Sequence, residues 1–143
     1  MSRLVKALSV QQPWAECIAR GDKRVENRRR NVRYRGPLAI HASLTWSAPG
    51  GHTPRVVATL TGALHHPLTH HDAARYGLAF GAVIAVAELV DCHPARGGCC
   101  GPWGEPDAHH LVLTRIERLP SPVPARGQLG LWEIGLPSGG DRA

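Results

Sequence analysis

The stretch that decides the fold is residues 8–43, LSVQQPWAECIARGDKRVENRRRNVRYRGPLAIHAS. Its apolar start continues a strand pattern, and Pro13 then opens a helix at the first helical position, where its missing N–H costs nothing. Trp14, Cys17 and Ile18 follow at helical spacing and predict one apolar stripe along this helix. The stretch therefore begins with a strand followed by a short helix.

Two more strands are predicted farther along the same stretch. Residues 23–28 indicate a polar strand with one aliphatic side chain, and residues 31–36 indicate a basic turn. Residues 38–43 alternate apolar and polar side chains, which is the pattern of a strand with one buried face.

Helices and strands also alternate in the rest of the chain. One helix is predicted from Pro54, after a cap at Thr53. A short helix is predicted after Thr69, which forms a capping box with Asp72, and it is expected to end near Tyr76.

Residues 80–92, FGAVIAVAELVDC, are almost uniformly apolar and predict a long strand at the centre of the sheet, buried on both faces. Glycines predict loops at residues 50–51 and 94–107. The last two strands are expected at residues 110–119 and 129–134, with a rigid proline-rich connection at residues 120–127 between them.

This order of elements predicts the α+β class. The connections are too short for a sheet of βαβ units, so we expect a small mixed β-barrel of about five or six strands with flanking α-helices. One domain is expected over residues 1–136, and residues 137–143 are expected to form a flexible C-terminal tail.

The charge of the chain favours an anionic partner. Its 143 residues carry a formal net charge of +6, and arginine far outnumbers lysine. Arginine binds phosphates and base edges with two parallel hydrogen bonds, so this composition raises the prior for nucleic acid. No apolar run is long enough to span a membrane, and the N-terminus lacks a signal-peptide core. The cysteine spacing is unlike that of a small secreted domain, so we expect a cytoplasmic protein with reduced thiols and no membrane partner.

Lys23 and Glu26 are the most informative pair of side chains. In a partly buried cleft each would keep the other charged, and together they could position a base edge or move a proton. Residues three apart lie on opposite faces of a regular strand, so their meeting requires a bulge or a strand that begins after Lys23. The alternative is a solvated ion pair between Glu26 and Arg28, two residues on and on the same face.

Other side chains of this stretch could complete a nucleic-acid site. His41 and Ser43 share a strand face, and Ser43 could contact a phosphate or act as a weak nucleophile. Trp14 suits either base stacking or core packing, whereas Trp103 lies in a glycine- and proline-rich loop and suits stacking. Trp132 is expected in the core. A phosphate-binding rim is expected from five closely spaced arginines, Arg28, Arg29, Arg30, Arg33 and Arg35.

Cysteines and histidines near the second predicted loop raise the question of a zinc site. They occur as Cys92-His93, Cys99-Cys100 and His109-His110. Adjacent cysteines fit one tetrahedral site poorly, and the usual two-residue spacer between ligands is missing. We therefore expect no metal ligands and no cofactor.

Four segments in order resemble the ASCH domain, a module of the PUA-like superfamily. They are LSVQQPWAECIARGDKRVENR, YRGPLAIHAS, GAVIAVAELVDC and PVPARGQLGLW, and the resemblance runs from about residue 6 to residue 132. It implies a PUA-like barrel with a cleft for RNA, DNA or a nucleotide. Some bacterial members are described as ribonucleases or as amidohydrolases that act on N4-acetylcytidine.

The amidohydrolase branch has a lysine on the strand after the first helix and a threonine, its proposed nucleophile, three residues later. Lys23 matches that lysine, whereas Glu26 stands in place of the threonine. A carboxylate cannot simply replace a hydroxyl nucleophile in amide hydrolysis.

The sequence thus predicts a protein that binds RNA or single-stranded nucleic acid in a basic cleft. One alternative is a metal-independent hydrolase, either a ribonuclease or a modified-nucleoside amidohydrolase, in which Lys23 and Glu26 handle the proton and Ser43 is a weaker catalytic candidate. Another is a protein-interaction module whose charge only aids solubility. The predicted nucleic-acid-binding residues are Gln12, Trp14, Lys23, Glu26, Arg28, Arg29, Arg30, Arg33, Arg35, His41 and Ser43.

Overall fold

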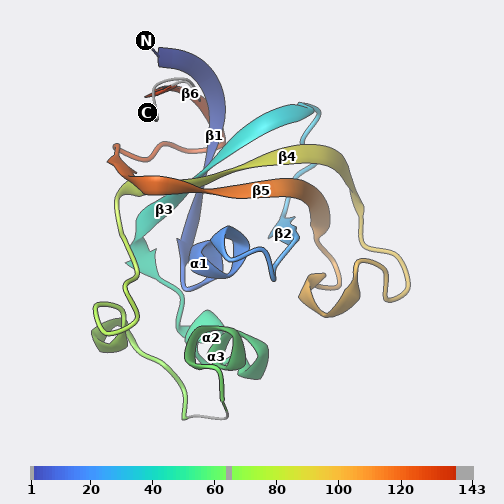
Figure 1. Ribbon diagram of the computed structural model, residues 1–143. Helices are drawn as coiled ribbons and strands as arrows, with labels where there is room; N and C mark the ends of the chain where they lie inside the picture. The colour runs from blue at the N-terminus through green and yellow to red at the C-terminus, as the bar shows by residue number, and fades with distance from the viewer. Residues whose placement is uncertain (1, 64–65, 138–143) are drawn as a thin grey trace.

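The computed structural model describes residues 2–63 and 66–137 (Figure 1). Its helices and strands in chain order are β1 (Ser2–Gln12), α1 (Trp14–Ala19), β2 (Val25–Arg28), β3 (Gly36–Trp46), α2 (Ala48–Gly51), α3 (Pro54–Thr61), the 3-10 turn η1 (His70–Asp72), β4 (Ala82–Pro94), the 3-10 turn η2 (Gly101–Trp103), β5 (His109–Pro124) and β6 (Leu131–Pro137). Residues 138–143, most of the predicted tail, lie outside the described residues.

Six strands of the described chain form one mixed sheet in the order β2-β5-β4-β3-β1-β6. β1 and β3 are parallel, and every other neighbouring pair is antiparallel. The α+β class and the mixed sheet with a few helices are therefore confirmed. Within the described residues β2 and β6 are the two ends of the strand order, so the closed barrel stays a prediction.

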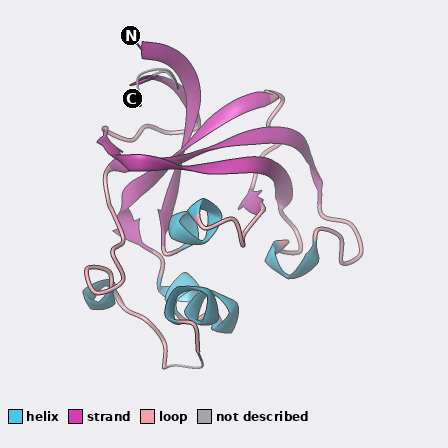
Figure 2. Ribbon diagram, in the orientation of Figure 1, coloured by secondary structure: helices cyan, strands magenta, loops and turns pink. Residues whose placement is uncertain are grey.

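The helices gather at one end of the molecule (Figure 2). α1 lies between the sheet and α3: Ile18 belongs to the same buried cluster as Ile40 of β3, whereas Cys17 belongs to a second cluster with Val56 and Leu60 of α3. The sequence predicted a single apolar stripe along α1. In the structure this helix is buried on two sides, against the sheet and against α3. The predicted central strand is confirmed as β4, which pairs with β3 and β5.

Two segments differ from the predicted pattern near turns. The glycines predicted as a loop belong to α2, where the Ser47 side chain caps the helix by accepting a hydrogen bond from Gly50 N at 3.0 Å. A Cβ at Gly51 would lie 2.2 Å from the Leu68 carbonyl oxygen, so this close approach requires glycine. The capping box between Thr69 and Asp72 is confirmed, but the helix after it is one 3-10 turn that ends at Asp72.

The proline-rich residues predicted as a connection belong to β5. Val123 and Pro124 pair with Val83 and Ala82 of β4. Proline is tolerated here because β2 pairs with β5 only over residues 109–112, which leaves the later part of β5 with one unpaired edge. Among the described residues, no helix is long and apolar enough to cross a lipid bilayer.

Truncation of a core residue of β3 should destabilise the fold strongly. We expect Ile40→Ala to lower the free energy of unfolding by about 2–5 kcal/mol, because Ile40 is fully buried and its removal leaves a cavity. Leu44→Ala in the same strand is the matched control, since Leu44 is 74% exposed and its truncation should change stability by less than about 0.5 kcal/mol. Urea unfolding followed by circular dichroism measures both values, and equal effects would contradict the assigned core.

Candidate functional site

A pocket of about 530 Å³ opens where the end of β1 meets α1, β2 and the loop between β4 and β5. Fourteen residues from five parts of the chain line it: Ser9, Val10, Gln11, Trp14, Lys23, Glu26, Asn27, Arg28, Arg29, Thr53, Arg55, Pro102, Trp103 and Glu105. Its volume lies within the range of about 300–1,000 Å³ that is usual for small-molecule sites.

A buried carboxylate with two cationic partners lies in this pocket. Lys23 Nζ is 3.0 Å from Glu26 Oε1, and Arg28 Nε is 3.1 Å from Glu26 Oε2. Lys23 can reach Glu26 because β2 begins at Val25, so the lysine precedes the strand and is free of its alternation. The sequence offered two alternative partners for Glu26, Lys23 and Arg28, and the structure contains both ion pairs.

The Lys23–Glu26 pair is shielded from solvent. The exposed fractions of the two side chains are 2% and 10%. Lys23 Nζ also donates to the Val25 carbonyl oxygen and lies 5.6 Å from the centre of the Trp14 ring. Two buried charges lose much of their hydration, so the net contribution of such a pair to stability is small.

Two tryptophans, Trp14 and Trp103, line the pocket. Trp14 contacts both buried clusters and donates from Nε1 to Ser47 Oγ at 3.0 Å, so it is both a packing residue and a pocket residue. Trp103 is far from Trp14 in sequence and belongs to η2. The guanidinium carbon of Arg55 lies 5.8 Å from the centre of its ring. Trp132 lies in the core as predicted, with 8% of its surface exposed.

Asn27 connects the loop between β4 and β5 to β2. Its Nδ2 donates to the Trp103 carbonyl oxygen at 2.9 Å, and its Oδ1 accepts from Glu105 N at 2.9 Å. One side chain thereby fixes the backbone at the last residue of η2 and just after it. The position of Trp103 against the pocket depends on this pair of hydrogen bonds.

The five predicted rim arginines do not act as one group. Arg28 and Arg29 line the pocket, whereas Arg30 and Arg33 are exposed outside its lining. Arg35 bonds to the Val32 carbonyl oxygen at 2.7 Å and lies 3.7 Å from Asp91, so it fixes the turn before β3. The sequence did not predict Arg55, because nothing in the local pattern of α3 connects it with β2.

Gln12, His41 and Ser43 are not among the pocket-lining residues. Gln12 is fully buried, and its Nε2 donates to the Ala79 carbonyl oxygen at 2.8 Å. Its Oε1 accepts from Glu16 N at 2.9 Å, which fixes the start of α1. His41 is 2% exposed, and its ring nitrogens contact Ser9 Oγ at 3.0 Å and the Ala125 carbonyl oxygen at 2.7 Å. His41 thus lies directly behind a pocket residue, Ser9.

Ser43 lies farther along β3. Ser43 is half-buried, and its Oγ is 3.0 Å from Thr45 Oγ1. The structure therefore does not bring the predicted His41/Ser43 pair together with Lys23 and Glu26.

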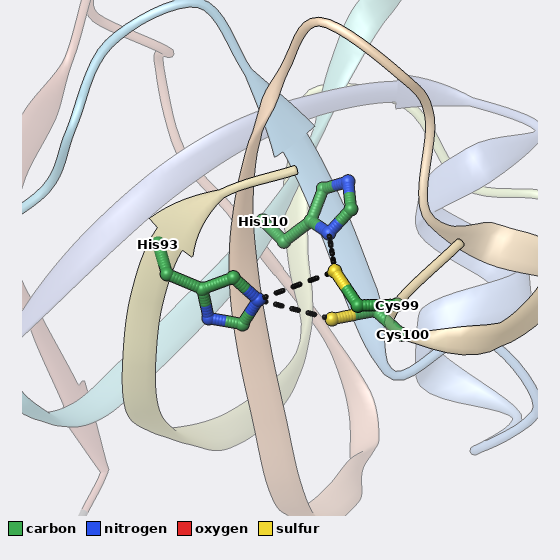
Figure 3. Close-up of side chains that lie close together, drawn as sticks. All are labelled: His93, Cys99, Cys100 and His110. Carbon is green, nitrogen blue, oxygen red and sulfur yellow. Dashed lines mark hydrogen bonds between the residues drawn. The ribbon is translucent and has the colours of Figure 1, made fainter. Parts of the chain in front are cut away.

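Side chains of the types that bind metals lie close together at the β4–β5 loop, outside the pocket lining. His93, Cys99, Cys100 and His110 lie with their ligand atoms within 4.8 Å of one another (Figure 3). The sequence argument from spacing did not anticipate this cluster. All four cysteines of the chain are free thiols, as expected.

Residues 8–108 match the family model of the ASCH domain, and this chain therefore belongs to the ASCH domain family. The match runs from β1 to the end of the loop between β4 and β5, so it contains all of the pocket-lining residues. No curated protein matches the chain.

Loss of the Glu26 charge should destabilise the protein. We expect Glu26→Gln to lower the free energy of unfolding by about 3 kcal/mol, because Lys23 would stay buried without a compensating charge. The matched control is Arg35→Gln, which breaks a half-exposed ion pair with Asp91 and should cost about 1 kcal/mol or less. Chemical denaturation of both variants provides the comparison. Equal, small losses would show that the Lys23 and Glu26 charges are solvated.

Proposed function

We propose that this ASCH domain protein binds single-stranded RNA and accommodates one unpaired nucleotide in the pocket. The observation that carries the proposal is the joining, in one pocket, of a buried Lys23–Glu26 ion pair with two tryptophans and an arginine rim. ASCH domains are generally linked to RNA binding, and the net charge of +6 suits an anionic polymer.

Lys23 and Glu26 have the hydrogen-bonding capacity to read a base edge. An ammonium group has three donors, and Lys23 uses two of them on Val25 and Glu26. A carboxylate has about four acceptor sites, so Glu26 keeps acceptor capacity beside Lys23 and Arg28. A donor and an acceptor side by side complement the Watson–Crick edge of an unpaired base.

The surrounding side chains suit the rest of the nucleotide. Trp14 and Trp103 offer aromatic faces, and base stacking on such faces contributes about 1–3 kcal/mol per base. Arg29 and Arg55 line the pocket and carry the charge to neutralise neighbouring phosphates. Single-stranded RNA fits this arrangement better than a duplex, because its bases can leave the strand and enter a pocket.

A hydrolase is the second candidate, either a ribonuclease or an amidohydrolase of a modified nucleoside. The observation in its favour is the same buried ion pair, because a lysine and a glutamate in contact beside a pocket can transfer a proton. In this reading Lys23 and Glu26 handle the proton. Ser43 lacks support as a nucleophile, since it lies outside the pocket lining.

Salt dependence distinguishes phosphate contacts from other binding. For a labelled single-stranded RNA, we expect affinity to fall as salt rises, and Arg29→Gln should reduce the log–log slope by about 0.7 because one phosphate contact is lost. Arg3→Gln is the matched control, since Arg3 is an exposed arginine at the opposite end of β1. Fluorescence anisotropy measures both slopes, with DNA of the same sequence alongside. Equal changes in the two variants would contradict binding at the pocket.

The same RNA, analysed on a denaturing gel, tests the ribonuclease. If the protein only binds RNA, the RNA stays intact with both chains, and Lys23→Met lowers the affinity. If it is a nuclease, product bands appear with the unmodified chain and vanish with Lys23→Met while much of the affinity remains. Methionine reproduces the lysine side chain as far as Cε and leaves Glu26 paired with Arg28, so the variant should fold. Absence of both binding and products at low salt would overturn the RNA proposal.

A further inference from the structure

The cluster of His93, Cys99, Cys100 and His110 is formed by β4, β5 and the loop between them, residues 95–108. His93 of β4 and His110 of β5 are register partners in the ladder, so their side chains lie on the same face of the sheet. Their ring centres are 5.7 Å apart. The loop returns over this face and brings Cys99 and Cys100 against the two imidazoles (Figure 3).

Three sulfur–nitrogen distances in this cluster match those of a tetrahedral metal site. Zn–S bonds of about 2.3 Å and Zn–N bonds of about 2.0–2.1 Å place neighbouring sulfur and nitrogen ligands about 3.5 Å apart. His93 Nε2 lies 3.2 Å from Cys100 Sγ and 3.7 Å from Cys99 Sγ. Cys99 Sγ lies 3.5 Å from His110 Nδ1. One ion at the centre could therefore contact all four atoms after small side-chain adjustments.

Both histidines are oriented as metal ligands usually are. His93 donates from Nδ1 to Asp91 Oδ2 at 2.9 Å, which directs Nε2 at the thiols. His110 donates from Nε2 to the Glu105 carbonyl oxygen at 2.7 Å, which leaves Nδ1 toward Cys99. A carboxylate or carbonyl on the far ring nitrogen is the usual way in which a protein fixes the tautomer of a metal-binding histidine.

The backbone of the loop is shaped to present the two sulfurs. Cys100 has φ of 68°, a left-handed conformation that is costly for a residue with a Cβ and that lets adjacent cysteines face one point. Arg96 N donates to Cys99 Sγ at 3.4 Å, a contact that favours the thiolate. A Cβ at Gly104 would lie 2.8 Å from His110 Cε1, so the loop can close over the cluster only with glycine there.

We propose that His93, Cys99, Cys100 and His110 form a structural site for one zinc ion. Thiolate and imidazole ligands together favour Zn²⁺, and four protein ligands leave no open position for substrate, which is typical of a structural site. The two thiols release their protons to solvent when the metal binds. This departs from the absence of metal ligands expected from the sequence.

Zinc at this site would stabilise one wall of the pocket, because the loop that carries the two cysteines also lines the pocket. Pro102, Trp103 and Glu105 lie between the two cysteines and His110, and all three line the pocket. With Asn27 holding the loop from one side and the metal from the other, the Trp103 wall has a fixed position. The zinc site goes beyond the proposed RNA binding and does not depend on it.

Titration of the reduced, metal-free full chain with Co²⁺ and then Zn²⁺ tests the site. We expect one equivalent of Co²⁺ to give the visible and thiolate charge-transfer bands of a tetrahedral sulfur site, and Zn²⁺ to displace it. Metal held by surface histidines alone, such as His70 and His71, gives no thiolate band. Cys99→Ser should lower the zinc affinity, measured by chelator competition, by about 100-fold or more, and Asp91→Asn by about 10- to 100-fold.

Cys92→Ser and His109→Asn are the matched controls, because each replaces the same residue type beside a proposed ligand. Cys92 Sγ accepts from Val32 N, and His109 faces the Arg29 carbonyl oxygen, so both side chains are engaged elsewhere. Both controls should keep the wild-type affinity and spectrum. Losses equal to that of Cys99→Ser would overturn the assigned ligands.

A measurement on the unmodified chain keeps the proposal testable if a cysteine variant fails to fold. Zinc should protect Cys99 and Cys100 from alkylation, read by mass spectrometry of peptides, and a chelator should remove that protection. The proposal is overturned if the folded, reduced chain binds no stoichiometric zinc. It is also overturned if zinc leaves the alkylation of both cysteines unchanged, or if the Co²⁺ spectrum is octahedral.

Discussion

The parallel pairing of β1 with β3 is the constraint on which the rest of this structure depends. Two parallel neighbours cannot be joined by a tight turn, so the chain between them must leave the sheet and return. That connection consists of α1 and β2. α1 covers the sheet and supports α3, while β2 pairs with β5 at the far end of the strand order.

This crossover also builds the pocket. Because β2 is separated from β1 by three other strands in the sheet order, the sheet must curve for their residues to meet. Arg28 Nη2 of β2 nevertheless donates to the Ser9 carbonyl oxygen of β1 at 2.5 Å. The contact spans the opening between the two strands, and the Lys23–Glu26 pair lies beside it. Two charges can be buried here because each has a hydrogen-bonding partner besides the other.

The loop between β4 and β5 contributes to both the pocket and the proposed zinc site. It presents Trp103 to the pocket, and it carries Cys99 and Cys100 to the two histidines. A glycine-rich loop of this length has few apolar contacts with which to hold one conformation. Hydrogen bonds to Asn27 fix one part of it, and a metal ion would fix the other, so the proposed zinc site gives a physical reason for the order of the pocket wall.

The sequence by itself determined the order of the six strands with α1 and α3 between them, the central position of β4, the proximity of Lys23 and Glu26 and the ASCH family. These depend on periodicity, on residues close in the chain or on motif order, all of which are local signals. Only the tertiary structure decided that Arg55 and Trp103 join the pocket, that Arg35 turns to Asp91, and that His93 and His110 lie side by side. Those contacts depend on strand register and on how a long loop closes. A shift of one residue in the β4–β5 ladder would place His93 and His110 on opposite faces of the sheet without changing the local sequence pattern.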